Sequence, residues 1–254
     1  MARVCAFCGG RGLTKEHAWP KWLLELLGPT PNVIHELIGS DKTVVRLRET
    51  SGLEVVVRRV CGSCNMGWMG NLETSNQGVL TELIQGQATR LTPTSQAGLT
   101  RWLVKTGMML NLSLHEQHIP SSHYHAFYAT KDPPDHMAAW LSSFEPSAPA
   151  PILSYLTQVG PLFGDFRRAR PMQLVRMEQI DCYLQTVKIG RLVGQILWSN
   201  SREFVEYAIR DQGSDGHTSL WPDPNVADWP ATKFEDFESY RAFGNRLYGW
   251  RTKE

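Results

Sequence analysis

The chain has 254 residues, of which 42% are hydrophobic and 20% are charged, so it can bury a sizeable core as one large or two small domains. Its formal net charge of +1 excludes a strongly basic protein, and any basic surface for nucleic acid has to be local. No apolar segment precedes Cys5 and no apolar run reaches membrane-spanning length, so we expect no signal peptide, no membrane partner and a cytoplasmic location.

Two Cys-x-x-Cys pairs stand out, Cys5–Cys8 in CAFCGG and Cys61–Cys64 in CGSCN. Disulfides fit poorly in a reducing compartment, whereas this spacing is usual for the ligands of structural zinc. Two intervening residues form a tight turn that points both thiolates at one metal. We therefore expect Cys5, Cys8, Cys61 and Cys64 to close one tetrahedral Zn²⁺ site that supports structure. The alternative is four buried small apolar residues, which is what we expect of the fifth cysteine, Cys182.

The segment between the two pairs predicts a helix and a β-hairpin. WPKWLLELLG at 19–28 places its tryptophans and leucines on one stripe and ends at Gly28-Pro29. Two β-branched runs, TVVRLRET at 43–50 and LEVVVRRV at 53–60, flank Ser51-Gly52 and predict the hairpin. Its second strand would lead directly into the second cysteine pair.

Beyond Asn65 the pattern predicts a mixture of helices and antiparallel strands. The expected helices cover 66–86, 95–116 with Ser95 as its N-cap, 135–144 and 234–247. The expected strands cover 121–130, 171–187 and 191–199, and a loop rich in Pro and Ala covers 145–153. Five of the eight histidines fall between His115 and His136; without supporting cysteines or paired carboxylates, we interpret them as surface and loop residues.

The order Cys pair, Glu16-His17, helix, Cys pair, Asn65, helix resembles the HNH, or ββα-metal, endonucleases. The resemblance is to the subgroup with a zinc-binding cysteine pair on each side of an Asp/Glu-His dipeptide, and it covers about residues 4–73. It implies an α+β fold in which residues 1–76 form a zinc-stabilised ββα-metal nuclease unit. Residues 77–254 would then form a mixed helix and antiparallel-sheet region of unknown role, with substrate selection as one candidate.

The resemblance also assigns roles to three residues. His17 would be the general base that takes a proton from the attacking water. Glu16 and Asn65 would hold a catalytic Mg²⁺ or Mn²⁺ through one carboxylate and one amide oxygen. The family's middle Asn, which orients the base histidine, has no counterpart in LEVVVRR at 53–59.

Four basic residues lie close in sequence to this trio: Lys15, Lys21, Arg58 and Arg59. They are candidates for contacts to phosphates, and solvated surface charge is an equally weighted alternative.

Two hypotheses for function follow. The first is a metal-dependent HNH endonuclease that hydrolyses phosphodiester bonds of nucleic acid, with DNA the substrate that the resemblance favours. The second is a catalytically silent, zinc-stabilised module for nucleic-acid binding or interaction. The joint presence of Glu16, His17 and Asn65 favours the first, and the missing middle Asn and near-neutral net charge favour the second.

Overall fold

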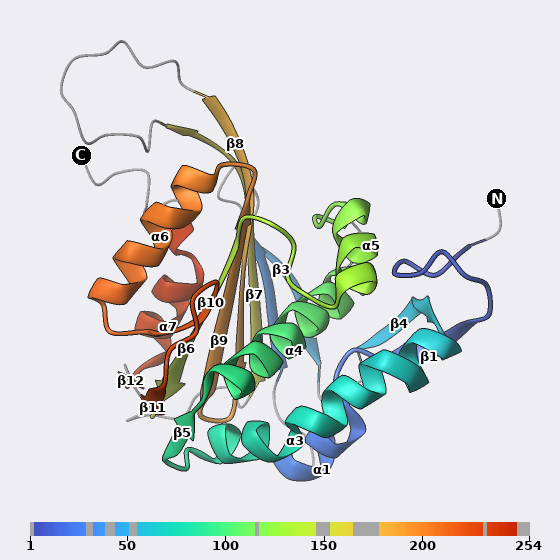
Figure 1. The fold of residues 1–254 in the computed structure, drawn as a ribbon, viewed down its shortest axis with the longest axis horizontal. Helices are drawn as coiled ribbons and strands as arrows, with labels where there is room; N and C mark the ends of the chain where they lie inside the picture. The colour runs from blue at the N-terminus through green and yellow to red at the C-terminus, as the bar shows by residue number, and fades with distance from the viewer. Residues whose placement is uncertain are drawn as a thin grey trace.

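The protein has a mixed α+β fold built around one large sheet (Figure 1). The computed structural model describes residues 3–28, 33–38, 44–50, 55–114, 117–145, 153–164, 178–230 and 233–247.

Seven strands of the large sheet follow the order β10-β6-β9-β8-β7-β2-β3, and β12 pairs with β6 from off this path. Neighbouring strands are antiparallel except at β2–β7 and β12–β6, which are parallel. Their bounds are β2 Val33–Ile38, β3 Val44–Thr50, β6 Met137–Phe144, β7 Leu153–Gly164, β8 Glu178–Ile189, β9 Leu192–Ser199, β10 Thr218–Trp221 and β12 Lys233–Phe234.

Helices cover both faces of this sheet (Figure 1). On one face lies α4 (Pro93–Leu112), with α3 (Gly70–Gln85) packed against it; α6 (Arg202–Ser214) and α7 (Phe237–Gly244) cover the other. Because both faces are covered, every residue of β8 from Cys182 to Ile189 is buried, and the strand shows no alternation of apolar and polar residues. Gly194 in β9 lets α4 approach closely, since Leu103 occupies the space that a Cβ would need.

The N-terminal segment packs on the outer side of α4. It contains β1 (Leu13–His17) and β4 (Val56–Cys61), which form a two-stranded antiparallel sheet, and α1 (Lys21–Leu27). β4 leads directly into α2 (Gly62–Cys64), the kinked segment η1 (Asn65–Met69) and α3. Buried side chains from this unit and from α4 belong to one hydrophobic cluster, so the strands that precede α3 have a fixed support.

Three shorter elements complete the described fold. α5 (Ser121–Thr130) follows α4, and the small strands β5 (Thr89–Leu91) and β11 (Ala227–Trp229) pair antiparallel. Among the described helices, none combines the length and apolar character that crossing a membrane requires.

Several sequence predictions are confirmed: the helices expected at 19–28, 66–86, 95–116 and 234–247, and the strands expected at 171–187 and 191–199, where these are described. The hairpin predicted across Ser51-Gly52 is wrong. β3 pairs with β2, whereas β4 pairs with β1, so long-range pairing overrides the local turn signal. The loop expected at 145–153 lies almost entirely outside the described residues.

Two neighbouring segments were predicted wrongly: the expected strand at 121–130 is a helix, and the expected helix at 135–144 is mostly a strand. Residues 121–130 form α5, in which Tyr124 and Phe127 are buried at a helical spacing of three. Residues 137–144 form β6, a strand with all eight residues buried; its continuous apolar run at 137–141 does not distinguish strand from helix. The N-cap of α4 is Thr92, whose hydroxyl accepts from the Ser95 N–H at 3.2 Å, so Ser95 lies inside the helix.

The division predicted between residues 76 and 77 falls inside the continuous helix α3. In addition, the β2–β3 hairpin, which belongs to the N-terminal segment in sequence, is part of the large sheet beside β7.

Candidate active site and metal centre

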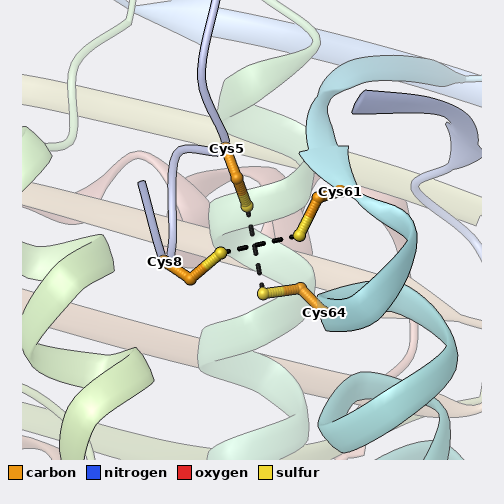
Figure 2. A group of neighbouring side chains, drawn as sticks. All are labelled: Cys5, Cys8, Cys61 and Cys64. Atoms are coloured by element: carbon orange, nitrogen blue, oxygen red, sulfur yellow. Dashed lines mark hydrogen bonds between the residues drawn. The ribbon is translucent and has the colours of Figure 1, made fainter. Parts of the chain in front are cut away.

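The four predicted zinc ligands converge. Figure 2 shows the side chains of Cys5, Cys8, Cys61 and Cys64 pointing at one another, and all four Sγ atoms lie within 4.8 Å of one another. The Cys5–Cys64 and Cys8–Cys61 sulfur pairs are 3.9 Å and 3.5 Å apart. Tetrahedral zinc with Zn–S bonds of ~2.3 Å separates its sulfurs by about 3.8 Å. The four cysteines can therefore hold a metal ion such as zinc.

A glycine-containing turn positions the first cysteine pair. The Gly9 N–H donates to the Cys5 carbonyl at 2.9 Å, and the Cys5 N–H donates to the Gly10 carbonyl at 2.8 Å. Gly9 has a φ of 70°, a backbone conformation that residues other than glycine rarely adopt. The Gly10 N–H points at the Cys8 sulfur, 3.4 Å away, as expected for a group that stabilises a thiolate.

The second pair lies where β4 becomes helix: Cys61 ends the strand and Cys64 ends α2. The Gly62 N–H donates to the Gly12 carbonyl at 3.2 Å, and the Ala6 N–H donates to the Arg59 carbonyl at 2.8 Å. The two cysteine pairs are thus joined by backbone hydrogen bonds as well as by their shared centre.

The electrostatic environment of the thiols is uneven. Burial raises the pKa of Cys64 well above its usual range, and burial also raises the pKa of Cys8. For Cys5, burial opposes ionisation, but hydrogen bonds from the backbone of Cys8, Cys61 and Phe7 outweigh it and lower the pKa to about 7. A bound cation would favour the thiolate at all four positions.

Aromatic side chains pack the cysteine centre against α5, a contact that the sequence reasoning missed. Trp68 lies edge-on to Phe7 and Phe127, with ring centroids 5.5 Å and 5.6 Å apart. Phe7 is also edge-on to Tyr124, at 5.2 Å. Predicting 121–130 as a strand concealed this role, because Tyr124 and Phe127 share a face only in a helix.

The second feature of the site is a contact between two of the three predicted catalytic residues. The Asn65 side-chain amide donates a hydrogen bond to the Glu16 carboxylate, and both side chains are half-buried. Glu16 lies near the end of β1 opposite Val57, and Asn65 directly follows Cys64. A 180° rotation of the amide would present its oxygen instead of its nitrogen, so both residues can offer oxygen to one cation.

A local change of helix geometry occurs at Asn65. Residues 65–69 join α2 to α3 across a kink, with non-helical backbone angles at Gly67 (φ −86°, ψ −111°). The kink separates Asn65, which contacts Glu16, from Trp68, which packs beside the cysteine centre.

His17, the predicted base, is the last residue of β1 and lies opposite Val56. Its side chain is exposed, so water and a phosphate group can reach the ring. The structure thus brings Glu16 and Asn65 into contact and leaves His17 at the surface, next to Glu16 in the chain.

Three of the four basic candidates lie at an irregularity of the small sheet. Between the pairs Thr14–Val60 and Glu16–Val57, the register of β1 and β4 shifts, so that both Arg58 and Arg59 lie opposite Lys15. Arg58, Lys15 and, at the start of α1, Lys21 are exposed. Arg59 is half-buried, and its carbonyl belongs to the contact with the first cysteine pair.

The segments that contain these residues carry more net positive charge than the chain as a whole. Residues 3–28 and 55–76 carry six lysines and arginines against three acidic residues. One of the three, Glu73, is neutralised by Lys105 of α4, whose ammonium lies 2.5 Å from the carboxylate. Because the net charge of the chain is near neutral, a surface that binds nucleic acid would need a local excess of positive charge such as this one.

The histidines beyond α4 do not assemble a second metal centre in the part of the chain that the structure describes, where the cysteine cluster is the only such group. His123 is half-buried and lies 3.2 Å from the Tyr183 hydroxyl; burial lowers its pKa. His125 and His136 are exposed, and His115 lies outside the described residues.

Comparisons of the chain with protein-family models, with curated proteins and with solved structures each found no match. What this site does therefore has to be inferred from its own residues.

Proposed function

We propose that the protein is a metal-dependent endonuclease of the HNH type that hydrolyses phosphodiester bonds in DNA. The observation that carries the proposal is the contact of Glu16 with Asn65 next to His17. Three residues of the required types lie where an antiparallel strand pair meets the start of a helix. The strand ladder and the cysteine cluster bring these two positions together, and the residues that occupy them are of the types that hold a divalent cation in the HNH pattern.

In this proposal the four cysteines bind one structural Zn²⁺. Four thiolates fill a tetrahedral site and leave no open position for substrate, so this centre contributes rigidity. It would fix the junction between β4 and η1, and with it the position of Asn65 relative to Glu16.

A catalytic Mg²⁺ or Mn²⁺ would be held by the Glu16 carboxylate and the Asn65 amide oxygen. When bound, such an ion supplies electrostatic stabilisation of the phosphate as negative charge builds on it and on the leaving oxygen. The exposed imidazole of His17 accepts the proton of the attacking water. Lys15 and Arg58 contact backbone phosphates beside the site and position the substrate.

The alternative is a silent zinc-stabilised nucleic-acid-binding or interaction module. The observation that favours it is the composition of β4, where valines and arginines precede Cys61 and no Asn is present to orient the exposed His17. In that case the basic surface would bind nucleic acid without cutting it.

A cleavage assay on supercoiled plasmid with Mg²⁺ or Mn²⁺ distinguishes the endonuclease from the silent binding module. We expect nicking by the wild type, loss of nicking with EDTA, and a loss of roughly 100- to 10,000-fold in His17→Ala with unchanged zinc content. The matched control is His136→Ala, an exposed histidine on the loop before β6. If the wild type cuts neither DNA nor RNA, or if His17→Ala cuts like His136→Ala, the nuclease proposal fails.

A further inference from the structure

One large apolar side chain next to the proposed site is unusually exposed. Among the described residues, three large hydrophobic side chains are exposed: Val4 at 45%, Val226 at 53% and Met66 at 79%. Met66 directly follows Asn65. Single exposed apolar residues are common on proteins, so its position has to supply the reason for assigning it a role.

The position of Met66 is defined by its neighbours. A Cβ placed on Gly62 would lie 3.5 Å from the terminal methyl of Met66 and 3.6 Å from the γ-methyl of Thr14. The Met66 side chain therefore lies over Gly62 at the start of the helical segment, on the side that faces Thr14 of β1. Thr14 precedes Glu16 by two residues. Its backbone is fixed on one side by Cys64 and by the bond from Asn65 to Glu16.

The surroundings of Met66 fit duplex rather than single-stranded nucleic acid. Surfaces for single strands present aromatic rings on which bases stack, whereas here Phe7 and Trp68 pack against each other. Proteins that open a duplex from the minor groove insert aliphatic side chains, Met among them, between base steps. Lys15 and Arg58, exposed at the strand irregularity, can hold the flanking phosphates.

We propose that Met66 is a wedge that enters the minor groove of duplex DNA and partly unstacks a base step beside the phosphate to be cut. This inference rests on the proposed nuclease function and adds to it the substrate form, duplex DNA that is easily distorted. Met suits the task because its unbranched, polarizable chain adapts to different base steps without reading their sequence. Unstacking is easier in underwound DNA, so supercoiled duplex is the preferred substrate.

Fluorescence anisotropy on a labelled duplex and on its single strand, with Ca²⁺ replacing Mg²⁺, tests the wedge independently of cleavage. We expect Met66→Ala to weaken duplex binding roughly tenfold, Met66→Leu to restore most of it, and single-strand binding to stay unchanged. Val226→Ala, the matched exposed residue, should bind like the wild type. In the plasmid assay, Met66→Ala should raise KM with little change in kcat and lose the preference for supercoiled over relaxed DNA.

The outcomes distinguish the wedge from the nuclease. If Met66→Ala binds duplex like Val226→Ala while cleavage still depends on His17, the wedge is rejected and the nuclease stands. If duplex binding falls with Met66→Ala but the wild type never cuts, the nuclease fails and the wedge stands. Equal losses on duplex and single strand, or no duplex binding by the wild type, also overturn the wedge.

Discussion

The Asn65 side-chain amide donates a hydrogen bond to the Glu16 carboxylate across 49 positions of the chain. Two cross-links enforce this contact, the antiparallel ladder of β1 with β4 and the cysteine cluster that joins the same two segments. Neither cross-link requires Glu16 or Asn65 themselves, so both residues can be replaced without dismantling the scaffold. This makes the pair a direct test of the proposed catalytic metal.

Asn65→Ala should raise the Mn²⁺ concentration needed for half-maximal cleavage by roughly 10- to 100-fold, because one oxygen ligand is lost. Raising Mn²⁺ should restore part of the activity, and Glu16→Ala should behave in the same way. Asn71→Ala is the matched control, since Asn71 is exposed on α3. A metal titration that gives equal midpoints for Asn65→Ala and Asn71→Ala would remove Asn65 from the metal site.

The purified protein should contain about one zinc ion per chain, because four thiolates complete one tetrahedral site. Cys61→Ser should lose the ion and melt at a lower temperature, since metal binding at such sites is coupled to folding. Cys182→Ser provides the control, because Cys182 is buried in β8 away from the cluster. Elemental analysis and thermal melts check this; full zinc content in Cys61→Ser would contradict it.

Arg58→Ala should weaken DNA binding and reduce the slope of log K against log salt by about 1, the change expected when one phosphate contact is lost. Arg202→Ala should change neither quantity, although Arg202 is 75% exposed, because it lies on α6 across the large sheet. Binding isotherms at several salt concentrations measure both. Identical slopes for Arg58→Ala and the wild type would leave Arg58 a solvated surface charge.

The cysteine cluster was predictable because its signal is local: each Cys-x-x-Cys pair is a turn, and two such turns offer the four ligands that one metal ion requires. The pairing of β4 with β1 could not be predicted from local signals. Residues 43–50 and 53–60 are both rich in β-branched side chains and flank a turn dipeptide, which is the pattern of a hairpin. Residues 39–43, GSDKT, offered a second turn signal of the same kind, and only long-range packing chooses between them.

Two features of the site could not have been read from the sequence. The irregularity that sets both Arg58 and Arg59 opposite Lys15 depends on the register of two strands far apart in the chain. The neutralisation of Glu73 by Lys105 depends on how α3 crosses α4. Residue types and their order predicted which groups take part in the proposed site, whereas tertiary packing decides which of them are accessible.

His217 should make the protein less stable in acid. Its ring lies beside Phe234 and Phe243, with Nδ1 2.5 Å from the Ser142 hydroxyl. Burial lowers its pKa to about 4. In the unfolded chain the pKa is about 6.5, so between pH 6.5 and pH 4 the unfolded state binds more protons and stability falls as the pH falls.

This loss should reach about 2 kcal/mol by pH 4.5 and be absent from His217→Gln, whose stability is lower at pH 7 but less dependent on pH. His125→Gln, which changes an exposed ring on α5, should retain the wild-type dependence. Denaturant unfolding at pH 7 and pH 4.5 gives the comparison, and any metal that the cysteines release in acid would be lost by all three proteins alike. Parallel profiles for His217→Gln and the wild type would contradict the prediction.

The Lys105–Glu73 pair should be asymmetric in its effect on stability. The Lys105 side chain is 2% exposed and that of Glu73 is 22% exposed, so the two partners differ in their access to water. Glu73→Leu leaves a buried ammonium without its counter-ion and should cost about 3–5 kcal/mol. Lys105→Met leaves a carboxylate that water can still reach, so it should cost less. The double variant, in which no charge remains, should recover most of the loss.

A double-mutant cycle by urea unfolding measures these three values. The same variants test whether the pair also positions the site, because Glu73 lies on the helix that continues from Asn65. If the pair only adds stability, all three variants keep the wild-type metal midpoint for cleavage wherever they are folded. If it positions the helix, Glu73→Leu raises that midpoint and the double variant brings it back. Equal costs for the two single variants would show that exposure does not govern the pair.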